Sequence, residues 1–198
     1  IFDLGNVLVD FNHYIAAKRI SPFSDRDEKE IFELFFDSHL TEVFEEGKIS
    51  PEDFFEEVKK CLNLKLDYQK FLPIWNEIFF LSEKNRAVYA LAKILKKDYS
   101  TAILSNINVL HFDYLKKTFP VFDAFHKVFA SFALGARKPS SLIYKKTLEI
   151  LGVSSKEAFY VDDRPELVEK ARQIGIQAFI FRDIAGLKKD LLNLGIKI

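Results

Sequence analysis

The sequence predicts an α/β fold, a doubly wound parallel sheet that carries a small inserted α-helical domain. From about residue 101 onward, short apolar runs alternate with amphipathic helical patterns, which is the order that right-handed crossovers build into a parallel sheet. Before that point, a helical block of about 70 residues separates the first apolar run from the second, far more than a plain strand-to-helix connection needs. We therefore place the sheet domain at 1–11 and 83–198 and the inserted helical domain at 12–82.

The chain begins with an apolar run that ends in a single carboxylate. Asp3 follows this run, and Gly5 and Asn6 then interrupt the extended backbone. Ligands of open α/β sheets bind just beyond the carboxyl ends of the strands, so Asp3 is well placed to act as a nucleophile or metal ligand. Asp shortly before Gly is also a common turn, and this segment alone leaves both interpretations open.

Amphipathic patterns predict the helices of the inserted block and of the return to the sheet domain. These helices are expected over 27–36, 67–80 and 84–97, and a further helix is expected to begin after Ser50. Ser50 has the side chain of an N-cap, and Pro51 suits the first turn of the helix that follows. The apolar face of that helix is expected to consist of Phe54, Phe55, Val58, Cys61 and Leu62. The single cysteine of the chain is thus expected in the core.

The remaining elements alternate, and three of their junctions bear polar residues. Strands are expected near 101–105, 128–131, 158–162 and 176–181, and helices near 109–118, 141–151, 165–174 and 186–193. One apolar run ends in Ser105-Asn106, a loop holds Lys138-Pro139, and another run ends in Asp162-Asp163. The order acid, Ser-Asn, Lys-Pro, Asp-Asp resembles the four-motif signature of the haloacid dehalogenase-like hydrolase superfamily, most of whose members are phosphatases. The resemblance extends from Asp3 to about Gly175.

This resemblance carries expectations about the fold. It implies the strand order 5-4-1-2-3, which centres Asp3 and brings Asp162 beside it. It also implies that the helical insertion is a cap over the active site. The phrases Phe2-Asp3-Leu4-Gly5-Asn6-Val7 and Glu46-Gly47-Lys48-Ile49-Ser50 resemble those of capped members described as glucose-1-phosphate phosphatase-like.

The chemistry of a phosphate monoester explains why such residues would be needed. A dianion resists attack by a carboxylate unless a metal and fixed donors first neutralise its charge. Mg²⁺ suits this role because it binds carboxylates, phosphate oxygens and water. The catalytic residues are expected to be Asp3, Lys138 and Ser105, and the phosphate-binding residues Ser105, Asn106 and Lys138. The metal ligands are expected to be Asp3 and Asp162 with Asp163 assisting, and the resemblance adds the carbonyl of Gly5.

Each motif also has a structural interpretation. Asp162-Asp163 could cap the helix that follows, Ser105-Asn106 could be a plain N-cap pair, and Lys138 could be a solvated loop lysine. Two adjacent acids at a strand end repel each other unless a cation joins them, which favours the metal site.

One residue departs from the family pattern. Typical phosphatases of this superfamily have a second Asp two residues after the nucleophile, which serves as general acid and base, and this chain has Gly5 there. Such catalysis contributes about 10²–10⁴ in rate. Asp10 is the nearest candidate to replace the acid, and a structural turn residue is its other interpretation. The dehalogenase branch also lacks this Asp, but it needs no metal, generally lacks the adjacent acidic pair and uses an arginine from the cap.

Composition excludes several function classes. Lys+Arg and Asp+Glu both number 29, so the formal net charge is zero and no nucleic-acid or polybasic membrane surface is indicated. No apolar run is long enough to span a membrane, and the N-terminus lacks the layout of a signal peptide. A cytoplasmic protein is expected, and its oligomeric state is left open. The four histidines show no metal-ligand spacing and are interpreted as surface or core residues.

The sequence therefore predicts a Mg²⁺-dependent, capped phosphatase of a small phosphorylated metabolite, with a sugar phosphate as one candidate and an aspartyl-phosphate intermediate at Asp3. Candidate cap contacts to the substrate are Phe44, Trp75 and Asn76. Two alternatives stay open. The chain could be a weak catalyst that binds a phosphorylated ligand or a protein partner, or it could be a metal-independent, dehalogenase-like hydrolase.

Overall fold

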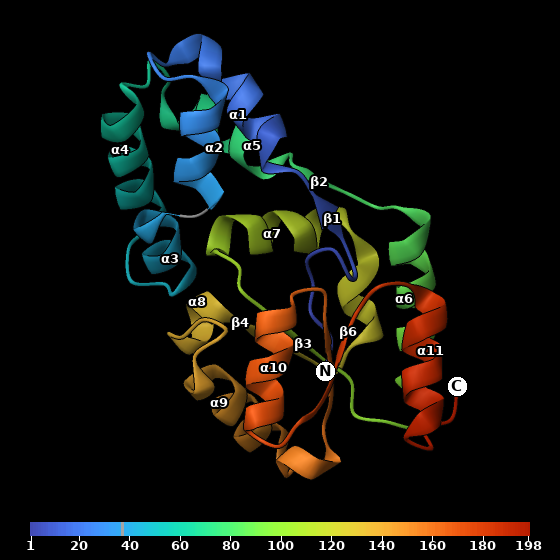
Figure 1. Ribbon diagram of the computed structural model, residues 1–198. Coiled ribbons are helices and arrows are strands. Elements are labelled where there is room, and N and C mark those ends of the chain that lie inside the picture. Colours follow the sequence, from blue (N-terminus) through green and yellow to red (C-terminus); the bar gives the residue numbers. More distant parts are fainter. Residues whose placement is uncertain (37) are drawn as a thin grey trace.

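The structure is a computed structural model that describes residues 1–36 and 38–198, and it has a helical part and a sheet part (Figure 1). The helical part consists of α1 His13–Ile20, α2 Glu28–Phe36, α3 His39–Glu45, α4 Pro51–Leu62 and α5 Tyr68–Asn76, with a 3-10 helix at Ser21–Phe23. Two short strands, β1 Asp10–Phe11 and β2 Phe79–Phe80, pair antiparallel where the chain leaves the sheet part and returns to it.

The sheet part alternates helices and strands as the sequence predicts. Its elements are α6 Glu83–Leu95, β3 Ala102–Ser105, α7 Val109–Thr118, β4 Lys127–Ala130, α8 Ser131–Leu134, α9 Ser141–Leu151, β5 Phe159–Asp162, α10 Pro165–Gln173, β6 Gln177–Ile180 and α11 Ile184–Asn193, with 3-10 helices at Pro120–Ala124 and Ser155–Glu157. Strand β3 pairs with β4 and strand β5 with β6, both in parallel. Phe2 forms parallel bridges to Ile103 of β3 and Val161 of β5, so the first segment lies between the two strand pairs.

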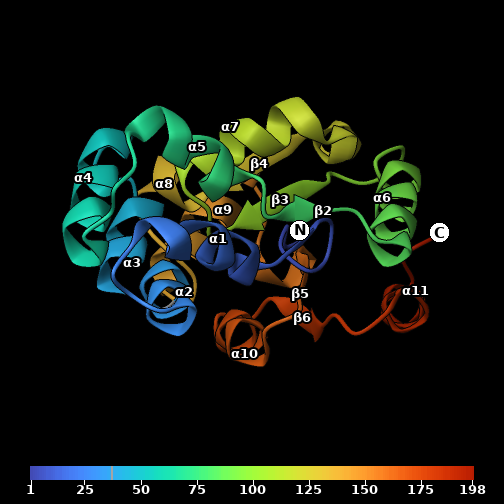
Figure 2. The ribbon, with the colours of Figure 1, turned by 90° about the horizontal axis from the view of Figure 1, so that it is seen from above.

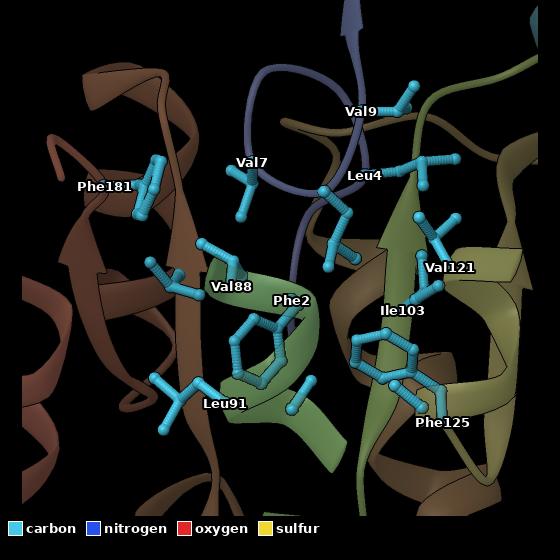
Figure 3. Packing of buried hydrophobic residues seen from close by; sticks show 14 of the residues in the cluster. Phe2, Leu4, Val7, Val9, Val88, Leu91, Ile103, Val121, Phe125 and Phe181 are labelled. Carbon is cyan, nitrogen blue, oxygen red and sulfur yellow. The ribbon is translucent and has the colours of Figure 1, made fainter. Parts of the chain in front are cut away.

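Helices cover both faces of this sheet because alternate strand residues point to opposite sides. On one face, Phe2, Ile103 and Val161 pack with residues of α6, α7 and α11. Figure 3 shows Phe2 beside Val88 and Leu91 of α6 and near the ring of Phe125, whose centroid is 5.5 Å from that of Phe2. On the other face, the next residues along the strands, such as Leu104 and Tyr160, pack with α9 and α10.

The helical part has a hydrophobic cluster of its own. Its fully buried members include Phe35, Phe54, Phe71 and Trp75. In the view of Figure 2, α1 to α5 gather at one side of the molecule, while α6 and α11 lie at the opposite end. The side chain of Ser50 accepts a hydrogen bond from Asp53 N, so the predicted start of α4 is confirmed.

The structure differs from the sequence-based expectation at three places. The helix expected over 67–80 ends at Asn76, and Phe79 instead pairs with Phe11 across β1 and β2. Cys61 is exposed. The other four apolar residues of its helix form the buried face, and Cys61 lies at the edge of that face. The first segment forms single bridges rather than a full strand. Within 1–36 and 38–198, no helix is long and apolar enough to cross a membrane.

Candidate active site

Three charged residues from distant parts of the sequence meet at the carboxyl edge of the sheet. Asp3 follows the bridging Phe2, and its N–H donates to the carbonyl of Val161 at 2.9 Å. Asp162 ends β5, and Lys138 lies in the loop before α9. The three residues are 7%, 0% and 3% exposed, respectively. Charges are almost never buried to this degree unless they are paired.

The ammonium of Lys138 joins the two carboxylates. Its Nζ lies 2.6 Å from Asp3 Oδ1 and 2.7 Å from Asp162 Oδ2, and 3.1 Å from the carbonyl oxygen of Leu104. The interpretation of Lys138 as a solvated loop lysine is therefore wrong. Pro139 follows in the same loop through a cis peptide bond.

Tyr160 completes this arrangement and was missed in the sequence. Its hydroxyl donates to Asp162 Oδ2 and accepts from Lys138 Nζ at 3.1 Å. A signal for it exists, because Tyr160 lies two residues before Asp162 and so shares its face of the strand.

Burial and the neighbouring charges shift the pKa values in the cluster. Burial raises the pKa of Asp3 to about 7, although the Lys138 ammonium opposes the shift. Burial alone would lower the pKa of Lys138, but Asp162 and Asp3 outweigh it and raise the pKa. Burial likewise opposes the charge of Asp162, yet Lys138 and Tyr160 hold its pKa below the usual value. The cluster is thus held together by a strongly stabilised ammonium.

A third carboxylate, Asp163, stands beside this pair. One oxygen from each of Asp3, Asp162 and Asp163 lies within 4.8 Å of the others, and Asn6 Nδ2 donates to Asp163 Oδ2 at 3.1 Å. One ammonium cannot neutralise three carboxylates, and carboxylate oxygens are the ligands that Mg²⁺ prefers. The residues present therefore fit a divalent cation. Gly5 lines the cavity beside them.

The structure also decides two capping alternatives. Helix α7 is capped by Asn108, whose side chain accepts from His111 N, so Ser105-Asn106 is not its N-cap pair. The side-chain amide of Asn106 instead holds the backbone of Lys138. Asn106 Nδ2 donates to the carbonyl oxygen of Lys138 at 2.9 Å, and Asn106 Oδ1 accepts from the N–H of Lys138 at 2.8 Å. The N-cap residue of helix α10 is Arg164, and its side chain makes no capping hydrogen bond. Asp162 Oδ1 does accept a hydrogen bond from Arg164 N, at 2.9 Å.

Asp10 is not placed to replace the missing acid. Its Oδ1 lies 2.8 Å from Lys84 Nζ and 3.1 Å from Asn85 Nδ2. Burial by itself would raise the pKa of Asp10, but these contacts outweigh burial and hold the pKa below its usual value. Asp10 does not line the cavity at the site. It anchors the connection between β1 and α6.

A cavity of about 500 Å³ lies over the cluster, and both parts of the chain line it. Of the predicted site residues, it is lined by Asp3, Gly5, Ser105, Asn106, Lys138, Asp163 and Trp75. Asp162 lies behind Lys138, outside the lining. Phe44 does not line the cavity because its ring stacks on Phe54 in the helical core, with centroids 4.2 Å apart. Asn76 also lies outside the lining.

Arg137 lines this cavity and joins the two parts of the molecule. Its Nε lies 2.8 Å from Glu45 Oε2 and its Nη1 2.7 Å from Glu42 Oε1, both on α3. The loop after α3 lies against α8, so closely that a Cβ on Gly47 would collide with the carbonyl oxygen of Phe132. Gly47 also has a φ of 68°, which favours glycine. The helical part is therefore fastened beside Lys138.

Removing the ammonium should destabilise the fold. In Lys138→Met, two buried carboxylates face each other unpaired, and we expect a loss of about 3–5 kcal/mol in the free energy of unfolding. Mg²⁺ should restore part of it, because a bound cation replaces the missing charge. Urea unfolding with and without Mg²⁺ measures both effects, and Lys145→Met on the exposed side of α9 is the control. Equal midpoints for the two variants would contradict this role.

Comparison with known proteins agrees with the geometry. A family model described as haloacid dehalogenase-like hydrolase matches residues 1–181. The chain is 23% identical over 197 residues to D-ribitol-5-phosphate phosphatase of Bacteroides thetaiotaomicron, covering 96% of this chain and 95% of that protein. It is 27% identical over 195 residues to a sesquiterpene phosphatase of Aspergillus oryzae, covering 98% and 94%.

A solved structure shares the fold. A HAD family enzyme of Bacteroides thetaiotaomicron, crystallised in complex with magnesium and inorganic phosphate, superposes with a TM-score of 0.81 at 23% identity over 92% of each chain. The finer resemblance to glucose-1-phosphate phosphatase-like members stays a prediction. Because the family model spans most of the sequence and all four motifs, the chain belongs to the haloacid dehalogenase-like hydrolase family.

Proposed function

We propose that this protein is a Mg²⁺-dependent phosphatase that hydrolyses a small phosphorylated metabolite through an aspartyl-phosphate at Asp3. The observation that carries the proposal is the buried cluster of Asp3, Lys138 and Asp162, with Asp163 beside it. Asp3, Lys138 and Asp163 of this group line the cavity. The phosphatase relatives and the magnesium and phosphate complex of a structural neighbour support it.

The chemistry assigns each residue a task. Asp3, Asp162 and Asp163 would hold Mg²⁺, with the Gly5 carbonyl as a further ligand, and the bound ion would neutralise charge on the phosphate. Lys138 reduces the repulsion between Asp3 and the dianionic ester.

The reaction then takes two steps. An oxygen of Asp3 attacks phosphorus and the bond to the ester oxygen breaks, which leaves a phosphoryl group on Asp3. Water hydrolyses this acyl phosphate, releasing inorganic phosphate and restoring the carboxylate. Ser105 Oγ and the N–H of Asn106 would hold the remaining phosphate oxygens.

The helical segment 12–82 would act as a cap over this site. Its lining residues Phe35, Thr41 and Trp75 help to enclose the cavity, and the ion pairs of Arg137 hold α3 against the sheet part. A cavity of this size admits a small molecule rather than a folded phosphoprotein. Substrate choice would therefore be set within the cavity.

The dehalogenase alternative is the less favoured one. The arginines that line the cavity are Arg137 and Arg164, and both belong to the sheet part rather than to segment 12–82. Asp162 could also position Lys138 without a metal, but the adjacent Asp163 adds a further carboxylate that a metal-independent reaction does not need. Binding without turnover stays the second candidate because Gly5 stands where a general acid would be.

Phosphate release decides between turnover and mere binding. We would assay sugar, aryl and alkyl phosphates with Mg²⁺ and measure inorganic phosphate. Release from some of these esters supports the proposal. Tight binding of inorganic phosphate without release from any ester would indicate a binding protein.

The missing acid predicts a dependence on the leaving group. Without an Asp at position 5, the ester oxygen departs with little proton assistance, so its own pKa should control the first step. Glycosyl-1-phosphates and aryl phosphates should therefore react faster than glycerol phosphate. A chemical step that does not vary with leaving-group pKa would mean that another group supplies the proton.

The missing acid can be restored by the substitution Gly5→Asp, and the structure shows what that side chain would meet. The φ of Gly5 is not positive, but a Cβ there would lie 2.8 Å from Cε1 of Phe11. Gly5→Asp alone should therefore gain little, whereas Gly5→Asp with Phe11→Ala should favour alkyl over aryl esters. The gain should be a fraction of the roughly 10²–10⁴ that general acid catalysis supplies.

A further inference from the structure

One side of the cavity is an unbroken series of aromatic rings. We call the aromatic wall the six lining residues Phe11, His13, Phe35, Trp75, Phe79 and His111. The centroid of the Trp75 ring lies 4.8 Å from that of Phe35 and 4.6 Å from that of His111. The series continues from His111 to Phe79 at 5.0 Å and from Phe79 to Phe11 at 6.1 Å.

The wall begins at the reaction centre. Phe11 occupies the space that a side chain at position 5 would need, because a Cβ on Gly5 would lie 2.8 Å from its ring. Gly5 is two residues from Asp3. The first atoms of an organic group on a bound phosphate would therefore lie against Phe11, and the rest would extend toward Phe79.

Most polar atoms on this side already have partners within the protein. His111 Nε2 lies 3.0 Å from the carbonyl oxygen of Trp75, and His111 Nδ1 lies 3.1 Å from Asn108 Nδ2. The hydroxyl of Thr41 donates to the carbonyl oxygen of Leu34 at 3.0 Å. In the part of the chain that the structure describes, the buried Nε1–H of Trp75 has no hydrogen-bond partner.

The wall also carries no charge at neutral pH. Burial lowers the pKa of His111 to about 3 and that of His13 to about 4, so both rings are neutral imidazoles. The guanidinium of Arg137, which also lines the cavity, is already paired with Glu42 and Glu45. A ligand at the wall therefore meets ring faces and neutral atoms.

We infer that the aromatic wall is a specificity site for an apolar organic group, a ring or short hydrocarbon that contacts the half-buried rings of Phe11, His13 and Phe79. This inference rests on the proposed function, because it names the substrate class of the same site. Contact with the rings removes apolar surface of such a group from water, which is favourable. A polyol would instead lose hydrogen bonds to water along a surface of aromatic rings that cannot replace them.

Kinetics on two esters with similar leaving groups test the substrate class. Both 2-phenylethyl phosphate and glycerol 3-phosphate release primary alcohols, so leaving-group pKa differs little between them. We expect kcat/KM to be at least about tenfold higher for 2-phenylethyl phosphate, as about 1.4 kcal/mol of apolar burial would give. Equal values, or a preference for glycerol 3-phosphate, would overturn the inference.

A matched pair of variants locates the effect. Phe79 and Phe80 are neighbours on β2, but Phe79 lines the cavity and Phe80 is 46% exposed. Phe79→Ala should remove most of the preference for 2-phenylethyl phosphate and leave inhibition by inorganic phosphate unchanged, whereas Phe80→Ala should retain the preference. Phe79→Leu is the substitute if Phe79→Ala does not fold. An unchanged preference in the Phe79 variant would contradict the role of the wall.

A binding measurement keeps this inference separate from the proposed function. Trp75 is the single tryptophan of the chain, so its fluorescence reports occupancy of the wall. Titration with 2-phenylethylphosphonate, which cannot be hydrolysed, should change the fluorescence, and Phe79→Ala should weaken the apparent affinity about tenfold. Binding without turnover of any ester would refute the proposed function and leave the wall supported. Turnover without any response of Trp75 to the phosphonate would refute the wall and leave the function.

Discussion

Asp3→Asn is expected to lower phosphatase turnover by at least about 10⁴-fold, the scale of loss when a nucleophile is removed. The amide has nearly the shape of the carboxylate but cannot form the acyl phosphate. The fold should persist, because Lys138 keeps its ion pair with Asp162 at 2.7 Å. Initial rates of phosphate release measure the loss.

Asp113→Asn is the control for this change. Asp113 is exposed on α7, so its substitution removes a charge without touching the site and should leave turnover unaltered. Circular dichroism checks that both variants are folded. An Asp3→Asn enzyme within tenfold of the wild type would mean that Asp3 is not the nucleophile.

Removal of Mg²⁺ is expected to produce the second large loss. Treatment with EDTA should reduce turnover by at least about 100-fold, because the charge of the phosphate dianion then opposes attack by a carboxylate. Added Mg²⁺ should restore the rate. Asp162→Asn should raise the Mg²⁺ concentration needed for half-maximal activity, and Asp113→Asn should not.

The opposite result would change the assignment. Rates in EDTA equal to those in Mg²⁺ would exclude the metal and favour the dehalogenase-like alternative. Loss of activity in Asp162→Asn that no Mg²⁺ concentration rescues would assign Asp162 to the positioning of Lys138 rather than to metal binding.

The sheet part could be predicted well because its elements are set by local patterns. Periodicity placed helices such as α7 and α9 correctly, and the N-cap residue Ser50 placed the start of α4. Asp3 and Asp162 were singled out by their place at the ends of apolar runs, and Lys138 by its place in the loop before a helix. The end of α5 was missed because the apolar run through Phe79 fits a helix as well as a strand. Only the pairing of Phe79 with Phe11, far away in the sequence, decides between them.

The cavity wall could not be predicted for the same reason. Its rings come from α1, α2 and α5 of the helical part, from the connecting strands β1 and β2, and from α7. Nothing local distinguishes Phe35 or Trp75 on the wall from Phe44 in the helical core. Asp10 was a candidate acid by proximity in sequence, whereas its partners Lys84 and Asn85 are brought to it by the fold. Residue type and order predicted which charged groups would meet at the carboxyl edge of the sheet, and three-dimensional packing determined what surrounds them.

The most direct test of the account is to detect the phosphoryl group on Asp3. The wild-type protein with Mg²⁺ and an aryl phosphate would be quenched in acid during turnover, and intact-mass and peptide spectra would be recorded. We expect the mass of one phosphoryl group on the peptide that contains Asp3, and no such adduct in Asp3→Asn. Steady turnover of the wild-type protein with no adduct on the Asp3 peptide at any quench time would contradict attack by Asp3.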